Sequence, residues 1–146
     1  MEQRDYLLRE IEKIGAIVNA IRQKLFGDHA NLALTIEQQI ENAKELLLNE
    51  ANFDLDQFLS LSIEESNEYI LSFDGFNVEN IELLAECISE IGFSDESVNA
   101  KNYLEKALQL YNLCNSKSKT YSTERATKIS LIKNTLQFNE DNEERI

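Results

Sequence analysis

An apolar residue recurs every three or four positions near the start of this chain, and this spacing constrains the fold more than any other feature. The recurring residues are Leu7, Ile11, Ile14, Val18, Ile21 and Leu25, at intervals of 4, 3, 4, 3 and 4. Such a heptad pattern places one apolar stripe along a helix, and a second surface must cover that stripe in water. The stripe therefore predicts either self-association through this helix or packing against another helix of the same chain.

The rest of the chain also favours helices. Its 146 residues include no proline, no tryptophan and four glycines. Proline and glycine are the residues that most often interrupt a helix. Parallel-sheet nucleotide-binding folds need glycine-rich turns, and β-sandwiches need a turn signal about every ten residues, but neither pattern is present. We therefore predict an all-α fold.

A second amphipathic helix is expected soon after the first. It carries apolar residues at the same spacing, namely Ile36, Ile40, Ala43 and Leu47. The two helices could form an antiparallel hairpin, because the connector between them is short. Gly27 would end the first helix. Thr35 followed by Gln38 resembles a capping box, although Asp28 could cap an earlier start of the second helix.

Shorter helices and then longer ones are expected further along. Asp54 with Gln57, and Ser62 with Glu65, are plausible N-terminal caps of two short helices. After Asp74-Gly75, a helix is expected from about 78 to 91, followed by a turn over 92–95. A long helix that ends at about 115 and a final helix from about 123 to 137 are expected after that turn. We divide the chain into an N-terminal helical hairpin (1–52), a helical array (53–138) and a frayed acidic tail (139–146), which form one folded unit.

Charge is distributed unevenly along the sequence, whose net charge is −13. Residues 28–113 hold eighteen acidic and three basic side chains, a net charge of −15, whereas residues 114–138 hold one acidic and five basic side chains, a net charge of +4. The acidic bulk would repel phosphate backbones and anionic lipid, so we expect neither nucleic acid nor a membrane as a partner. The basic segment predicts a C-terminal helix that lies beside the acidic middle and lowers its self-repulsion.

An acidic stripe is the most specific surface feature. It consists of Glu79, Glu82, Glu86 and Glu90, which fall on one side of a predicted helix, opposite its apolar face. Three interpretations remain open. The stripe could be a solvated surface, a dock for a basic peptide or helix of a protein partner, or the site of ion pairs with Arg125 and Lys128 of the same chain.

No motif for catalysis, a cofactor or a metal is recognisable in the sequence. The single histidine, His29, falls in an expected exposed connector without suitable ligands nearby. Asp54-Leu55-Asp56 lacks the glycine and the later ligands of a calcium loop. We therefore expect no catalytic residue, no cofactor and no metal site.

The two cysteines and the N-terminus bear on localisation. Cys87 and Cys114 lie far apart in predicted helices, which indicates two free thiols in a reducing compartment. A buried, unreactive thiol is expected at Cys87, because neighbouring glutamates would raise its pKa. The charged N-terminus is unlike a secretion signal, and no apolar run is long enough to span a bilayer. These features predict a cytoplasmic location.

Large and small residues follow a recognisable order over 78–113. The large ones are Ile81, Leu84, Ile88 and Leu104, and the small ones are Ala85, Ala100 and Ala107. This order resembles one tetratricopeptide-like helical hairpin. The resemblance implies a stack of helix pairs in which the acidic stripe lines a concave groove and the final helix caps the stack. The chain departs from the family pattern in its longer turn, in lacking the closing proline near Asn112 and in having no second repeat.

The opening segment 5–12, Asp-Tyr-Leu-Leu-Arg-Glu-Ile-Glu, is similar to the start of an uncharacterised bacterial family of small helical proteins, a domain of unknown function. This similarity implies a bacterial source and a helical fold. It implies no activity and no catalytic residues.

Together these features predict a non-catalytic protein-protein interaction or scaffold module. Its partner would be a basic protein at the acidic stripe, or a second copy of the chain at the first helix, giving a homodimer. One alternative is an acidic mimic of a polyanion that inhibits a nucleic-acid-binding protein. Another is an enzyme with a carboxylate site in a deep pocket, where burial would raise the pKa of an Asp or Glu.

Overall fold

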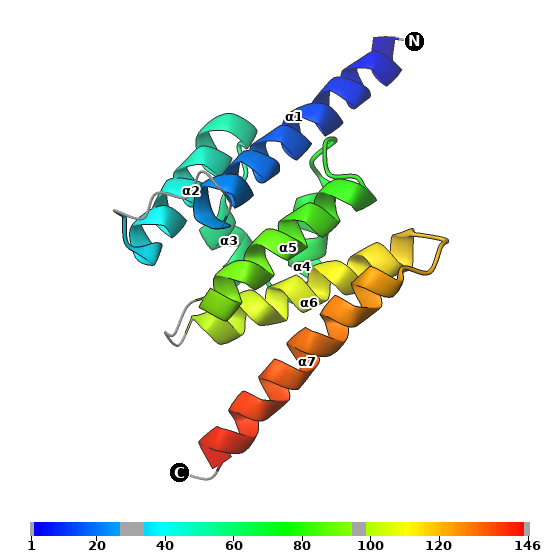
Figure 1. Cartoon of the computed structure of the whole chain (residues 1–146). Helices are drawn as coiled ribbons and strands as arrows, with labels where there is room; N and C mark the ends of the chain where they lie inside the picture. Colours follow the sequence, from blue (N-terminus) through cyan, green and yellow to red (C-terminus); the bar gives the residue numbers. More distant parts are fainter. Residues whose placement is uncertain (1, 27–33, 95–98, 145–146) are drawn as a thin grey trace.

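The computed structural model describes residues 2–26, 34–94 and 99–144, and these residues form helices joined by short turns (Figure 1). The helices are α1 (Glu2–Phe26), α2 (Ile36–Ala51), α3 (Leu55–Ser60), α4 (Ile63–Leu71), α5 (Val78–Ser94), α6 (Ala100–Lys117) and α7 (Thr123–Glu144). No strand occurs in these ranges, so the predicted all-α fold class is confirmed. Gly27, Asp28 and His29, for which the sequence suggested roles, lie outside the described residues.

The apolar stripe of α1 is divided between the core and the surface. Its last four residues, Ile14, Val18, Ile21 and Leu25, are buried where α1 packs against α2 and α5. Leu7 is exposed and Ile11 is half-buried. The first turns of α1 extend beyond the helices that cover the rest of it (Figure 1). The stripe therefore serves mainly as core, and only its first part is accessible to a partner.

The predicted caps of the shorter helices are present. Thr35 and Gln38 form a complete capping box at the start of α2, so this helix does not begin near Asp28. The Asp54 side chain accepts a hydrogen bond from the Gln57 amide at α3. In the same way, the Ser62 side chain caps α4. Each cap satisfies an amide that has no partner inside its helix, which explains why these helices begin where they do.

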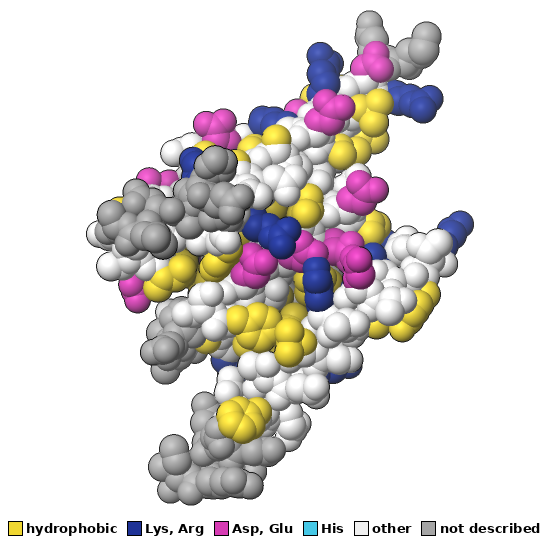
Figure 2. All heavy atoms as spheres, in the orientation of Figure 1, with side chains coloured by type: hydrophobic (Ala, Val, Ile, Leu, Met, Phe, Trp, Pro, Cys, Tyr) yellow, Lys and Arg dark blue, Asp and Glu magenta, His cyan; other side chains and the backbone are white. Residues whose placement is uncertain are grey.

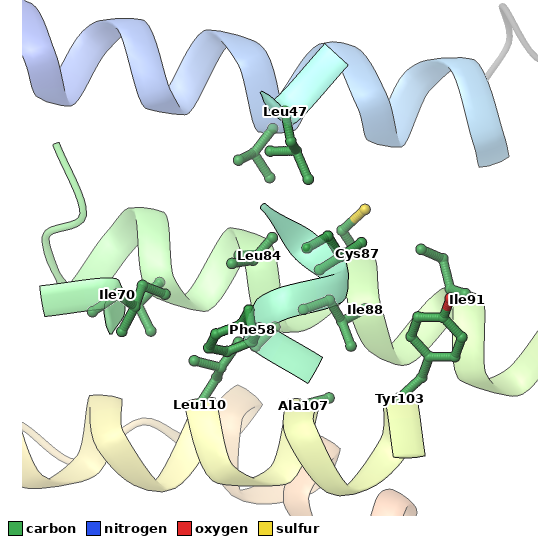
Figure 3. Packing of buried hydrophobic residues seen from close by; sticks show 14 of the residues in the cluster. Leu47, Phe58, Ile70, Leu84, Cys87, Ile88, Ile91, Tyr103, Ala107 and Leu110 are labelled. Carbon is green, nitrogen blue, oxygen red and sulfur yellow. The ribbon is translucent and has the colours of Figure 1, made fainter. Parts of the chain in front are cut away.

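α5 and α6 form the centre of the molecule and make its most extensive helix–helix contact. Their facing residues, among them Leu84, Ile88, Ala107 and Leu110, are buried in one continuous apolar cluster (Figure 3). The turn predicted over 92–95 is wrong at its start, because α5 continues through Ser94. Gly92 serves helix packing instead: a Cβ at this position would lie 2.8 Å from both Cδ2 and Cγ of Leu104 in α6.

α7 lies along α6 and projects beyond it at its C-terminal end (Figure 1). The helix continues through Glu144, past the end near residue 137 that the sequence predicts and into the segment expected to be a frayed tail. Of the described side chains from 123 to 139, only Arg125 and Ile132 are buried. α7 is therefore the helix that contributes least to the core for its length.

Candidate functional site

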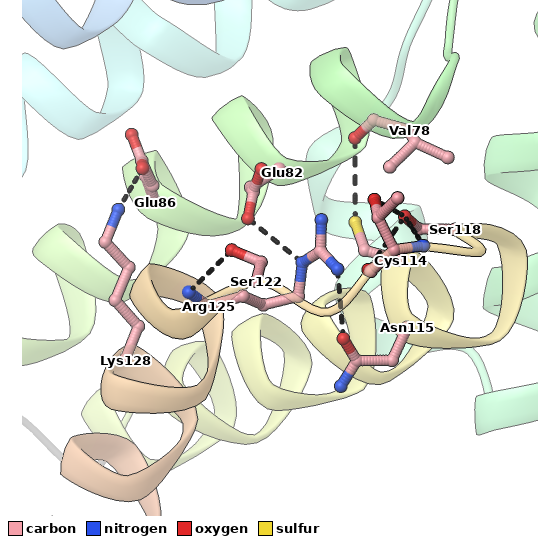
Figure 4. Close-up of polar contacts among 10 residues, drawn as sticks. Val78, Glu82, Glu86, Cys114, Asn115, Ser118, Ser122, Arg125 and Lys128 are labelled. Atoms are coloured by element: carbon pink, nitrogen blue, oxygen red, sulfur yellow. Dashed lines mark hydrogen bonds and ion pairs between the residues drawn. The ribbon is translucent and has the colours of Figure 1, made fainter.

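The acidic stripe of α5 lies between α1 and α7 and is lined by cations from both helices (Figure 2). From α7, Arg125 Nε donates to Glu82 Oε1 at 3.0 Å, and Lys128 forms an ion pair with Glu86 (Figure 4). Arg125 Nη1 also donates to Asn115 Oδ1 of α6 at 3.0 Å. The arginine thus joins α5, α6 and α7 through one guanidinium group.

Arg22 of α1 contacts the same stripe from the other side. Its Nη1 lies 3.2 Å from Glu86 Oε2, and its Nη2 lies 3.2 Å from Glu90 Oε1. Burial lowers the pKa of this guanidinium, but the hydrogen bond and charge of Glu90 outweigh burial and leave the pKa above its ordinary value. Because three cations of the chain lie among these glutamates, this face is not a uniform polyanion.

Two members of the acidic stripe have carboxylate oxygens without a partner among the described residues. Glu79 is exposed and has no ion pair with another described residue. Glu90 Oε2 is buried without a hydrogen-bond partner. The hydroxyl of Tyr111 on α6 is buried near Ser89 of α5, and burial and the charge of Glu86 raise the pKa of this group. The acidic stripe therefore contains carboxylate oxygens, on Glu79 and Glu90, that neither α1 nor α7 binds.

A second candidate surface is the N-terminal end of α1, residues 3–9, which we call the α1 tip. All seven of these side chains are exposed, including the large apolar residues Tyr6, Leu7 and Leu8. Contact with the body begins only at the next turn, where the Ile11 carbonyl accepts a hydrogen bond from Asn80 Nδ2 at 2.8 Å. The α1 tip is thus an apolar surface that nothing within the described residues covers.

A buried lysine links the junction of α3 and α4 to α6, and no pattern in the sequence predicts it. Lys106 Nζ donates to the Leu61 carbonyl at 2.6 Å, to Ser66 Oγ at 3.0 Å and to Gln109 Oε1 at 3.2 Å. It also lies 5.4 Å from the centroid of the Phe58 ring. Desolvation lowers the pKa of Lys106. All three ammonium hydrogens have acceptors, so the lysine acts as a polar cross-brace between helices.

A groove of about 630 Å³ lies beside this lysine, between the start of α4 and α6. Its lining combines apolar side chains such as Leu59 and Leu108 with the amides of Asn67, Asn102 and Asn112. Glu105 is the only carboxylate in that lining, and it is exposed. This groove does not supply the paired carboxylates that acid–base catalysis by an enzyme of this kind would need.

Both cysteines are free thiols buried in the core. Burial, with a smaller contribution from Glu90, raises the pKa of Cys87 to about 12. Burial also raises the pKa of Cys114 to about 11. The Cys114 thiol lies 3.6 Å from the Val78 carbonyl of α5, where it can donate a hydrogen bond. Because the thiolate is the reactive form, both thiols should be unreactive in the folded chain at neutral pH.

We expect the folded chain to lose stability as the pH rises above 9. Each thiol has an ordinary pKa of 9.0 and a higher pKa when folded, so the unfolded chain releases its proton first. The stabilisation is complete below pH 9 and is lost as the pH rises towards 11–12, by about 1.4 kcal/mol per pH unit for each thiol. Urea denaturation at pH 8 and pH 10 measures this loss, and the Cys114→Ala variant should lose less between the two pH values. An equal loss in both chains would contradict the assignment to Cys114.

None of the helices within the described residues combines the length and the apolar character needed to cross a membrane. In the same residues, no three His, Cys, Asp or Glu side chains gather in an arrangement that could hold a metal ion. Comparison with protein-family models, with curated proteins and with solved structures finds no match to this chain.

Proposed function

We propose that this chain is a non-catalytic assembly module that pairs with a second copy of itself through the α1 tip. The observation that carries the proposal is the exposure of Tyr6, Leu7 and Leu8, at 49%, 43% and 49%, on a helix end that projects from the body. Consecutive side chains lie about 100° apart around a helix, so Leu7 is at the centre of this exposed surface, with Tyr6 and Leu8 on either side of it. Covering Leu7 and parts of its neighbours favours association, because it removes apolar surface from solvent.

The charges around these apolar residues fit a second copy. Arg4 precedes Leu7 by three residues and Glu10 follows it by three, so the two charges flank Leu7 symmetrically on the helix. If two tips cross antiparallel at Leu7, Arg4 of each copy comes level with Glu10 of the other, within reach of an ion pair. A two-fold axis through the crossing would make both pairs equivalent. Neither residue has an ion pair within the described part of the chain.

The projection of α1 also favours this arrangement. In an antiparallel crossing the two bodies lie at opposite ends of the pair, which limits repulsion between chains that each carry a net charge of −13. The contact would be small, below the roughly 1,200 Å² of total buried area at the low end of stable complexes. We therefore expect a weak dimer, with a dissociation constant in about the micromolar range or above.

The helix pair α5–α6 forms the centre of the body from which the α1 tip projects. We infer a tetratricopeptide-like packing for α5 and α6, supported by their extensive contact and by the complete burial of Ala85 and Ala107. A rigid pair of this kind would serve as the support on which the partner surfaces are displayed.

Exchange of the two charges tests the pairing. Arg4→Glu and Glu10→Arg should each weaken dimerisation about tenfold, because each variant sets like charges against each other at two symmetric places. The double variant should recover the affinity of the original chain, because it re-forms both pairs with the signs exchanged. Sedimentation velocity over a concentration series measures the dissociation constant of each chain.

A matched pair of acidic substitutions separates the tip from the rest of α1. Leu7→Asp should leave the helix content unchanged and abolish the dimer, whereas Ala20→Asp, at an exposed position further along α1, should leave the dimer intact. A chain that stays monomeric up to about 1 mM would overturn the proposal, since even weak pairing is visible there. A double variant that stays as weak as the single ones would overturn the antiparallel register.

A further inference from the structure

α7 is held on the molecule by a small apolar contact and by the ion pairs of a few charged side chains. Its partly buried apolar residues are Ile129 and Leu136, and Ile132 is the only fully buried one among its described side chains. Leu131 and Phe138 are exposed, at 55% and 65%. By comparison, seven apolar residues of α6 are buried. A helix with so little buried apolar surface belongs to the part of a fold that opens most easily.

The polar contact depends on a few charges. Arg125 and Lys128, three residues apart on α7, pair with Glu82 and Glu86, four residues apart on α5. The Lys128 side chain is 36% exposed, so dissolved salt can screen its pair with Glu86, whereas Arg125 is buried and its pair with Glu82 is screened much less. The attachment of α7 should therefore weaken as the ionic strength rises.

The acidic stripe is not fully satisfied by α7. Beside the two glutamates that pair with α7, Glu79 has no ion pair with another described residue, and Glu90 Oε2 is buried without a hydrogen-bond partner. Buried polar atoms without partners are few in folded proteins, and this one belongs to the acidic stripe. Glu79 and Glu90 are the groups of the stripe that a helix with more donors than α7 could use.

We propose that the face of α5 and α6 under α7 is a binding site for a basic amphipathic helix, and that α7 is its resident, displaceable occupant. α7 itself defines the chemistry of the partner: two cations three residues apart, Arg125 and Lys128, with apolar residues four and seven positions after the first, Ile129 and Ile132. A partner helix of this pattern replaces α7, pairs with Glu82 and Glu86, and covers the same apolar surface. This site is separate from the α1 tip and does not depend on pairing there.

Binding of a partner helix to this site has to compete with α7. α7 is tethered by the short connector 118–122, so its effective concentration at the site is about millimolar and it masks binding of a free helix. The apparent affinity for an added helix equals the intrinsic affinity reduced by the fraction of chains in which α7 is detached. Weakening α7 without changing α5 or α6 should therefore strengthen the binding of a peptide.

The probe is a fluorescently labelled peptide with the sequence of residues 123–138, added to the full chain. We expect it to bind the Lys128→Glu chain about tenfold more tightly than the original chain, because the new charge repels Glu86 and detaches α7. Lys133→Glu is the matched control, because Lys133 is exposed on the same helix and has no ion pair with another described residue. The control chain should bind the peptide as weakly as the original chain.

A peptide that carries Lys128→Glu should bind none of the three chains, which shows that binding uses the acidic stripe. Equal binding of the original peptide to all three chains, or no binding to the Lys128→Glu chain, would overturn the proposal. Hydrogen exchange on the unmodified chain is a second test, independent of how the variant folds. The amides of α7 should exchange at least tenfold faster than those of α5 and α6, and faster still in high salt. Equal protection of the three helices would also overturn the proposal.

Discussion

Ile21→Asp is expected to unfold the chain. Ile21 is 2% exposed and lies in the core where α1 packs against α2 and α5. Aspartate at this position loses the apolar contacts of isoleucine and places a carboxylate in an apolar environment. The combined cost, more than about 5 kcal/mol, is comparable with the whole stability of a typical domain. Far-UV circular dichroism and urea denaturation should show the loss of most of the helix.

The neighbouring position provides the control. Ala20 is exposed on the same helix, so Ala20→Asp introduces the same charge with only the helix-propensity cost of about 0.7 kcal/mol. If Ile21→Asp were as stable as Ala20→Asp, the buried part of the apolar stripe would not be core. The whole stripe would then be open to a partner, and the assembly surface would extend well beyond the α1 tip.

The two roles of the apolar stripe show what periodicity can and cannot predict. The spacing from Leu7 to Leu25 predicts that some surface covers this face of α1, but it carries no information on how far the covering helices reach. α1 has 25 residues, whereas α2 has 16 and α5 has 17. At about 1.5 Å per residue, α1 is longer than either partner and extends past both. Because α1 is longer than α2 and α5, Leu7 lies in solvent, whereas Ile21 is buried between the three helices.

Local and long-range signals differ in the same way elsewhere in the fold. The caps at Thr35, Asp54 and Ser62 depend on side chains within three residues of each other, so the sequence predicts them and the structure confirms them. Gly92 has a role that depends on Leu104, which lies on the next helix. A glycine that permits close helix packing looks the same in sequence as one that permits a turn, and the predicted turn was wrong for this reason.

The candidate sites were predictable to the extent that charge alone could place them. Pairing of Arg125 and Lys128 with the acidic stripe is one of the three interpretations that the acidic middle and the basic segment after it allow, and both residues contact the stripe. The contact of Arg22 with the stripe is not predictable from the sequence, because Arg22 belongs to a helix more than fifty residues away along the chain. Lys106 was missed because its acceptors are uncharged, and no pattern of charges identifies them.

Phe53→Ala is expected to cost about 3–5 kcal/mol of stability, as large aromatic-to-alanine changes in cores do. Phe53 is fully buried in the link between α2 and α3. Its ring centroid lies 5.2–5.4 Å from those of four other aromatic residues, Phe58, Tyr69, Phe73 and Phe76. Alanine would leave a cavity between α3, α4 and the turn before α5, and it would remove the tilted ring contacts that add to simple burial.

Urea denaturation of three variants separates burial from aromatic character. Phe53→Leu keeps much of the buried volume and should lose less than half as much stability as Phe53→Ala. Phe138→Ala removes the same ring from a position that is 65% exposed, so it should change the stability by about 0.5 kcal/mol or less. If Phe53→Ala were as mild as Phe138→Ala, the aromatic cluster would not be a rigid core. α3 and α4 would then be held to α6 chiefly by two buried polar residues of α6: Lys106, which donates to the Leu61 carbonyl and Ser66 Oγ, and Gln109, which donates to the Ile63 carbonyl and Asn67 Oδ1.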